Sequence, residues 1–281
     1  MLLEGTDSLQ ERLRSDLGAI ARPRHALWDP LGLMAVRSHL IEKLGELGPL
    51  ERHGFGSGAT AGINLILRLP GRRGDLSPLL VGAHYDGPPQ SVGADDNASG
   101  VAALLELARR WAADPPQRPS WFVAFDQEEW GMLGSQALVE RLRAEGQRLK
   151  LMVSLEMLAY TAENQSYPHP AMEAVYGSRG DFIALISNLR GSWCLPGLGR
   201  SLGRHVKTRL LPVPMGGRWI PEVRLSDHSP FWDAGYDALM VTDTSFMRNP
   251  HYHRMSDTVE TLDRPFLAAV AEGLDRALRG I

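Results

Sequence analysis

Five short, mostly apolar runs constrain the fold of this 281-residue chain more than any other feature. They lie at residues 63–69, 79–83, 121–125, 151–155 and 238–242. Each run has the length of a strand, and a strand without regular polar alternation needs cover on both of its faces. The sequence therefore predicts a central sheet that is buried between two layers.

Segments with apolar residues at helical spacing precede these strands and separate most of them. The expected helices cover residues 8–19, 34–47, 98–111, 135–143, 182–189 and 264–279. Alternation of strands and helices is typical of a sheet with helices on both faces. We expect one three-layer αβα domain of the α/β class over residues 1–281, with a mixed, mostly parallel central sheet.

Residues 190–225 differ in composition from the rest of the chain. They are rich in Gly, Pro, Arg and Trp, which favours loops over regular elements. We expect an irregular, loop-rich insertion in the same domain, with one strand near residues 205–211, rather than a second domain.

Composition and charge argue against several classes of function. The chain is 43% hydrophobic, which is enough for a substantial core. Its 30 Lys and Arg residues balance 33 Asp and Glu residues to a net charge of −3, without a long basic run, so we expect no nucleic-acid partner. No apolar run approaches the roughly 20 residues of a membrane span, so we expect no role within a membrane.

Two features bear on the cellular compartment. Cys194 is the only cysteine, which excludes an intramolecular disulfide. The chain starts MLLEGTDSLQERLRSDLGAI, with acidic residues where a secretory signal has a basic end and an apolar core. We therefore expect a cytoplasmic protein; the sequence carries no signal for an oligomeric state.

Polar residues follow directly after several of the apolar runs, where ligands of α/β sheets bind. His84 and Asp86 come after the second run, two positions apart, so both project to the same side of an extended backbone. Asp86 can accept from one imidazole nitrogen and leave the other free for a metal. Taken alone, the pair is explained more simply as a strand-end histidine that hydrogen-bonds a neighbouring aspartate.

Three further clusters follow along the chain. Asp95 and Asp96 stand in the turn GADDNASG before a helix, where turn and N-cap roles also explain them. Glu128 and Glu129 follow the third run, and adjacent carboxylates diverge, so one can bind a metal while the other moves a proton. His253 precedes a Ser-Asp-Thr turn. Each cluster has an ordinary structural explanation, but only a two-metal hydrolytic site uses all four.

Such a site has defined chemical requirements. Catalytic zinc takes about three protein ligands from His and carboxylates and keeps a position for water. Two ions roughly 3.5–4 Å apart need a shared carboxylate, and an Asp on a tight turn can offer both of its oxygens.

Six motifs in order carry a resemblance to a known family. They read HYD, GADDNASGVAALLE, EEWGMLGS, LEM, SDHSPF and YHRMSDT, between about residues 60 and 265. Together they resemble the co-catalytic dizinc aminopeptidase family, which also contains glutamate carboxypeptidases and glutaminyl cyclases. The family has the αβα fold expected above.

The resemblance implies a role for each matching residue. Two zinc ions are implied, the first bound by His84 and Glu156, the second by Glu129 and His253, and both by the bridging Asp96. Asp86 would orient His84, and Glu128 would act as the general base. Glu156 stands where many members have Asp, which affects metal binding at the first position.

Further residues match less closely. Asp227 and His228 fall in a motif near the substrate, and Asp257 is placed to support His253. Some members have a carbonyl-polarising Tyr before SDHSPF, where this chain has Arg224, so Arg224 is one candidate for that role. His251 is an alternative to His253, while the other histidines match no motif and are expected in loops or on the surface. These are His25, His53, His169 and His205.

The resemblance implies a metallo-aminopeptidase that hydrolyses N-terminal residues from peptides or small aminoacyl substrates. A glutaminyl-peptide cyclotransferase and an inactive binding module with the same fold are the alternatives. Cyclases generally lack the histidine of the first zinc, and inactive members lose ligands, so His84 and the complete ligand set favour hydrolysis. Side-chain preference stays open between apolar residues and acidic ones bound by Arg218 or Arg224. The candidate apolar pocket residues are Tyr167, Phe182, Trp193, Met215 and Trp219.

Overall fold

The computed structural model describes residues 2–281, with side chains for all of these except 2–8 and 59. Within this part of the chain, one eight-stranded sheet has the order β1-β2-β4-β3-β5-β8-β6-β7. The strands are β1 (Leu50–Phe55), β2 (Gly62–Leu69), β3 (Leu79–His84), β4 (Ser120–Phe125), β5 (Leu151–Glu156), β6 (Phe182–Asn188), β7 (Lys207–Val213) and β8 (Ala238–Thr242).

The sheet is mixed, with a parallel centre. β3 pairs in parallel with β4 and β5, and β5 pairs in parallel with β8. The β6–β7 pair is also parallel, while β1–β2, β2–β4 and β6–β8 are antiparallel. The expected mixed, mostly parallel sheet is confirmed.

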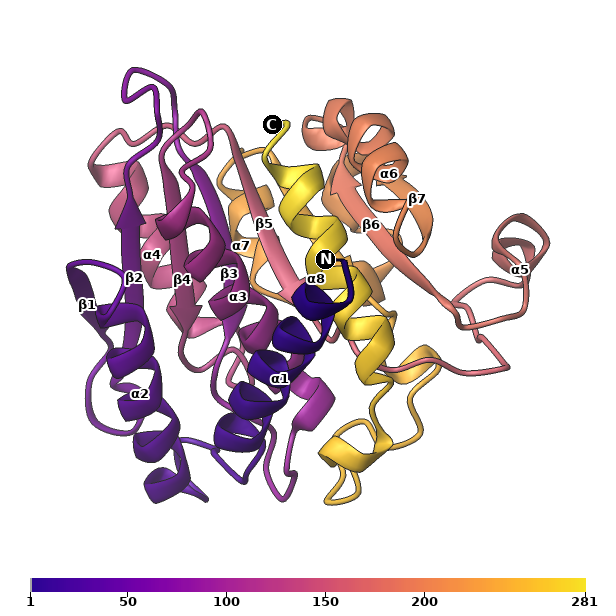
Figure 1. Ribbon diagram of the computed structural model, residues 1–281, viewed down its shortest axis with the longest axis horizontal. Coiled ribbons are helices and arrows are strands. Elements are labelled where there is room, and N and C mark those ends of the chain that lie inside the picture. Colours follow the sequence, from indigo (N-terminus) through magenta and orange to yellow (C-terminus); the bar gives the residue numbers. More distant parts are fainter. Residues whose placement is uncertain (1) are drawn as a thin grey trace.

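Helices cover both faces of the sheet (Figure 1). They are α1 (Leu2–Ile20), α2 (Pro30–Gly45), α3 (Gly100–Ala113), α4 (Leu133–Ala144), α5 (Pro170–Tyr176), α6 (Leu195–Leu202), α7 (His228–Asp233) and α8 (Arg264–Leu278). Apolar residues of α1, α2, α3, α6 and α8 pack on one face, and those of α4 and α7 pack on the other. The two cores explain why the central strands are apolar along their whole length.

The expectation of a helix over residues 182–189 is wrong, because this segment forms β6. All seven residues of β6 are buried, whereas a surface helix would leave one side exposed. The run FIALI is short and wholly apolar, and periodicity cannot separate a buried strand from a buried helix in such a run.

Residues 190–225 are more regular than expected. They contain α6 and β7 in addition to short turns. β7 lies close to the strand expected near residues 205–211, but α6 was not foreseen.

Helix α5, which precedes β6, extends away from the body of the molecule (Figure 1).

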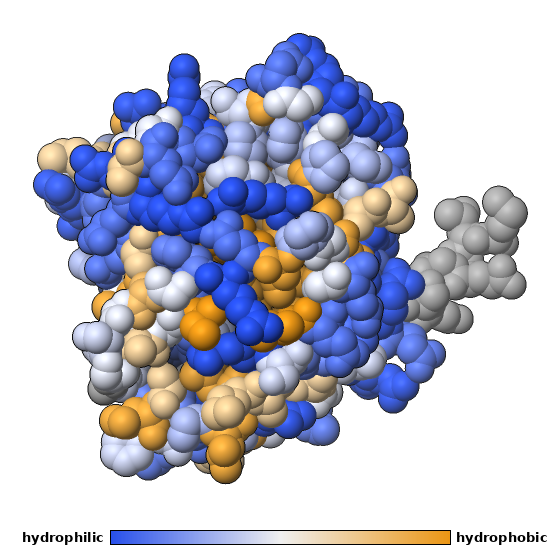
Figure 2. All heavy atoms as spheres, turned by 90° about the vertical axis from the view of Figure 1, so that its left-hand side faces the viewer, coloured by the Kyte–Doolittle hydropathy of each residue, from blue (hydrophilic) through white to orange (hydrophobic). Residues whose placement is uncertain are grey.

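The face that carries the β1 edge and α2 is mostly hydrophilic, with apolar patches between the polar side chains (Figure 2). Leu27, Trp28, Leu31 and Met34, in and just before α2, are exposed apolar side chains. Over residues 2–281, no helix has both the length and the apolar character that crossing a bilayer requires.

Candidate metal centre

The ends of two neighbouring parallel strands provide the first pair of candidate ligands. His84 is the last residue of β3 and Glu156 is the last residue of β5. The Nε2 atom of His84 lies 3.6 Å from Oε2 of Glu156 and 3.4 Å from Oδ1 of Asp96. These three buried side chains form one group that can hold a metal ion.

Asp96 also belongs to a second group. Its other oxygen, Oδ2, lies 3.1 Å from Nε2 of His253, and this nitrogen lies 3.5 Å from Oε2 of Glu129. The ligand atoms of Asp96, Glu129 and His253 are all within 4.8 Å of one another. One carboxylate thus presents an oxygen to each group, which is the arrangement that two neighbouring ions need.

The turn that carries Asp96 is held by buried side chains. Asp257 accepts hydrogen bonds from the backbone N–H groups of Asp95 and Asp96, with N···O distances of 3.0 and 3.1 Å. Asn97 donates to the carbonyl of Leu155 at 2.8 Å and so joins the turn to β5. Sequence reasoning assigned Asp257 to the support of His253; its contacts instead fix the backbone of the bridging residue.

Asp95 and Asp96 have different surroundings although they are adjacent. Asp95 accepts hydrogen bonds from the N–H of Ala159 and from the side chain of Asn249, so it joins the turn to two other loops. Of these two aspartates, Asp96 is the one that contacts His84 and His253. Its pKa lies below the usual value of 3.8 because hydrogen bonds from His253 and His84 outweigh the effect of burial.

Asp86 contacts His84, as the sequence predicted, and also the backbone of the loop that follows β4. Its Oδ1 atom lies 3.4 Å from Nδ1 of His84, on the side of the ring away from the candidate ligands. The carboxylate also accepts the backbone N–H groups of Glu128 and Glu129 at 3.1 and 3.2 Å. Asp86 therefore connects the end of β3 to the loop that follows β4.

The two adjacent glutamates of that loop lie half-buried beside the buried His84, and the three form a further candidate ligand group. Burial raises the pKa of Glu128 well above its usual 4.5, and the carboxylate of Glu156 adds to this rise although the charge of His84 opposes it. Burial likewise raises the pKa of Glu129, and Asp96 adds to it. A raised pKa of this kind suits a group that accepts a proton from water.

The chemistry of this cluster fits divalent cations. Carboxylates outnumber the two histidines, and buried negative charges are stable only when cations or hydrogen bonds compensate them. Oε1 of Glu129 is buried without a hydrogen-bond partner among the described residues. Imidazole nitrogens and carboxylate oxygens in groups of three are the ligand set of catalytic zinc.

Among the predicted substrate contacts Asp227, His228 and Arg224, Asp227 lies beside the cluster. Asp227 is fully buried, and its pKa is raised to about 7 by burial, while the nearby charge of His84 lowers it. Nε2 of His228 instead lies 2.8 Å from the carbonyl oxygen of Val223, and its ring packs on Trp232. Burial lowers the pKa of His228 to about 3.

Arg224 also points elsewhere. Its guanidinium donates to the carbonyl of Gly216 and to Asp233, the latter at 2.6 Å. It is absent from the described residues that line the cavity, whereas its neighbours Val223 and Leu225 line it. The structure therefore does not support a substrate contact by His228 or Arg224.

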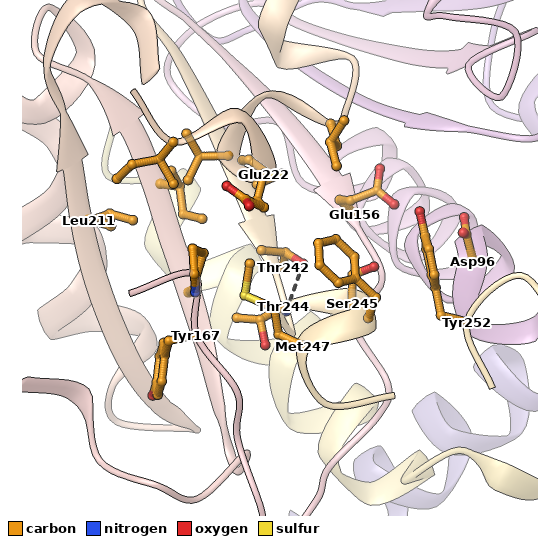
Figure 3. Close-up of a pocket in the computed structure, with 18 of the residues that line it drawn as sticks. Asp96, Glu156, Tyr167, Leu211, Glu222, Thr242, Thr244, Ser245, Met247 and Tyr252 are labelled. Carbon is orange, nitrogen blue, oxygen red and sulfur yellow. Dashed lines mark hydrogen bonds between the residues drawn. The ribbon is translucent and has the colours of Figure 1, made fainter. Parts of the chain in front are cut away.

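A cavity of about 270 Å³ opens from the cluster. Asp96, Glu156 and Tyr252 lie at one end of it and Tyr167 and Leu211 at the other (Figure 3). Most of the remaining lining is apolar and comes from β6, β8 and the loops around residues 220–225 and 244–247.

Sequence reasoning found only part of this lining. Tyr167 and Phe182 line the cavity as expected. Trp193 packs against Lys150 instead, and the side chains of Met215 and Trp219 are exposed. Tyr252, which stacks on His253 at a ring distance of 3.7 Å, was not foreseen, because nothing in the sequence distinguishes it from a packing residue.

The chain is similar in sequence or in fold to several known proteins. The chain is 34% identical over 209 residues to the uncharacterized protein YfbL of Escherichia coli K12, covering 70% of this chain and 64% of YfbL. The structure of BSAP, a zinc aminopeptidase from Bacillus subtilis, superposes with a TM-score of 0.59 at 26% identity, over 78% of this chain and 49% of that protein. The chain thus spans about half to two thirds of the length of these two relatives.

A Macrostomum lignano glutaminyl cyclase shares the fold over nearly the whole of both chains. Its TM-score is 0.76 at 16% identity, and the match covers 98% of this chain and 90% of the cyclase. Residues 64–277 match the model of Peptidase family M28. The family resemblance inferred from the ordered motifs is thereby confirmed, and the chain belongs to Peptidase family M28.

Proposed function

We propose that this protein is a zinc-dependent aminopeptidase that removes apolar residues from the N-terminus of peptides. The observation that carries the proposal is that two ligand groups share Asp96 while Glu128 adjoins them and an apolar cavity opens from them. The zinc aminopeptidase among the structural relatives adds support.

The ligand groups define what zinc would do here. His84, Asp96 and Glu156 would hold one ion, and Asp96, Glu129 and His253 the other. Two bound zinc ions would lower the pKa of a water molecule and stabilise negative charge on the scissile carbonyl.

The chain's own groups would move the proton and hold the substrate. Glu128 accepts a proton from the water molecule as the water oxygen attacks the carbonyl carbon. Glu128 then passes that proton to the amine nitrogen as the C–N bond breaks. The N-terminal side chain lies in the apolar cavity, and the free α-amine lies beside the carboxylates of the first group. Placement of the reacting bond between these groups is worth several kcal/mol.

Hydrolysis is favoured over cyclisation by the first ligand group. A single ion would need only one group, whereas His84 contacts both Asp96 and Glu156 and completes a second one. Likeness to the glutaminyl cyclase extends to the fold alone.

The test combines metal analysis with turnover. We expect two zinc ions per chain, cleavage of leucyl-nitroanilide, loss of cleavage on chelation and recovery on adding zinc. Glu128→Gln should lower kcat by about 10²–10⁴-fold while the zinc content stays unchanged, because it removes the proton acceptor.

Three outcomes would contradict the proposal in different ways. Folded protein that takes up no zinc supports a binding module. Conversion of a glutaminyl peptide to a cyclised product of unchanged length supports the cyclase. Near-normal turnover by Glu128→Gln with full zinc would show that another group is the base.

A further inference from the structure

The connector between α1 and α2 places a fully buried arginine beneath the candidate metal centre. Arg24 is 0% exposed, and its guanidinium donates only to main-chain carbonyl oxygens in the contacts that the described residues make. Nε donates to Tyr85 at 3.0 Å, Nη1 to Val92 at 2.8 Å, and Nη2 to Gly93 at 2.8 Å and Asp96 at 3.1 Å. Nη1 also donates to Arg22 at 3.1 Å.

Apart from that of Arg22, these carbonyls belong to two of the three segments that carry the first ligand group, those of His84 and Asp96. Tyr85 lies between His84 and Asp86 in the chain, so its carbonyl fixes the backbone at the end of β3. The carbonyl of Asp96 fixes the bridging residue itself. One planar guanidinium, whose five N–H directions are rigid, therefore sets the separation of these two backbone segments.

Two glycines make room for this side chain. A Cβ atom at Gly93 would lie 2.9 Å from Nη1 of Arg24, and one at Gly87 would lie 3.1 Å from its Cγ. Gly93 also has a φ of +60°, which non-glycine residues rarely adopt. Glycine at position 93, in the turn before Asp96, is therefore favoured both by the backbone conformation of the turn and by the space that Arg24 occupies.

Stability alone does not explain a buried guanidinium. Burial lowers the pKa of Arg24, and the carboxylates of Asp96 and Asp86 act against that effect. Replacing buried charges by apolar residues of similar volume is often neutral or stabilising. Each nitrogen of the Arg24 guanidinium donates to a carbonyl of a segment that carries a candidate ligand. The geometry that these contacts impose on the site therefore explains the buried arginine better than stability does.

The next residue reaches the other loop of the site. His25 lies in a loop, as expected, but its side chain is buried, and its Nε2 accepts a hydrogen bond from the indole of Trp130 at 2.6 Å. Trp130 directly follows Glu129. Residues 24 and 25 together therefore contact the segments that carry His84, Asp96 and Glu129, although they lie outside the residues 64–277 that match the family.

We infer that Arg24 is a positioning residue of the metal centre, which holds His84 and Asp96 at the spacing that the first ion requires. The inference rests on the proposed function, since it presupposes that the cluster binds metal. It makes the connector between α1 and α2 part of the site rather than a link between two covering helices.

The experiment measures zinc affinity in Arg24→Lys and Arg24→Ala by competition with a chromophoric chelator. Lysine keeps the positive charge but not the planar arrangement of five N–H donors. Both variants should therefore bind the first ion about 10–100-fold more weakly, which is the usual effect of losing contacts that orient ligands. Millimolar ethylguanidinium should restore part of the affinity of Arg24→Ala and leave wild-type protein unchanged. Arg109→Met, which removes a half-buried arginine paired with Asp16, is the control for general destabilisation and should keep full affinity.

The outcomes separate the two proposals. Wild-type protein that binds no zinc would overturn the proposed function and this inference with it. Unchanged affinity for both ions in a folded Arg24 variant would overturn the inference alone. If Arg24→Ala does not fold, Arg24→Lys with its thermal unfolding curve decides the question.

Discussion

Asp96 has a short side chain, and its position depends almost entirely on its backbone. Its N–H is bound by Asp257 and its carbonyl by Arg24, so both ends of the residue are held. The two carboxylate oxygens are then directed to His84 and His253 without freedom to turn elsewhere. A residue held in this way can serve two ligand groups at once.

Replacing Asp96 should therefore affect both groups together. We expect Asp96→Asn to bind less than one zinc ion per chain and to lose activity by at least about a hundredfold, because an amide offers one oxygen and no charge. Elemental analysis of the purified variant measures the metal. Glu129→Gln is the comparison and should weaken one ion only; two full equivalents in Asp96→Asn would show that it does not bridge.

At the level of elements, the strand ends and the loops with motifs could be predicted, whereas the contacts of the connector between α1 and α2 could not. His84 and Glu156 follow directly from apolar runs, so their meeting at one sheet edge was foreseeable. Short ordered motifs also indicated Asp96, Glu129 and His253. Arg24 could not be found, because its contacts lie across a connector and no local pattern marks a buried arginine. β1 was missed because its alternating polar residues suit an exposed edge.

The contact of α1 with α3 makes a prediction about pH. Asp16 of α1 is buried and accepts both Nη atoms of Arg109 on α3, at 2.6 and 2.9 Å. Burial raises the pKa of Asp16, but hydrogen bonds from His39 and Arg109 outweigh it and leave the pKa below the usual 3.8. The charged form thus contributes stability above about pH 4, and this contribution is lost as the pH falls through the folded-state pKa.

Asp16→Asn should accordingly lower the free energy of unfolding by about 1–3 kcal/mol at pH 7, and by progressively less below pH 4. Urea unfolding at several pH values measures the difference. The exposed pair Arg73–Asp75 provides the control, since Asp75→Asn should have little effect at any pH. A difference for Asp16→Asn that is independent of pH would rule out the ionic explanation.

Strand β6 makes a prediction about specificity. Ala184 lies in this strand and lines the cavity. Ala184→Phe should fill the cavity and raise KM for leucyl-nitroanilide about tenfold, with a smaller effect on alanyl-nitroanilide, because a large apolar side chain loses its contact area. Leu189→Phe, at the exposed end of the same segment, should change neither value. Equal effects on both substrates would place the side-chain pocket elsewhere.

For the whole molecule, the candidate ligands connect distant parts of the chain and carry uncompensated negative charge. Bound zinc should therefore stabilise the native state by mass action. We expect chelation to lower the melting temperature by about 5–10 °C and added zinc to restore it. Differential scanning calorimetry measures the shift, and Asp96→Asn should show almost none. A wild-type melting temperature unaffected by chelator would contradict metal binding by the native cluster.

The order of the ligands along the chain has a consequence for biosynthesis. The first group is complete once Glu156 has been made, whereas the second waits for His253, in the loop before α8. A polypeptide still emerging from the ribosome therefore lacks the second ligand group until translation has passed His253. The shared site that the proposed function requires can form only after that point.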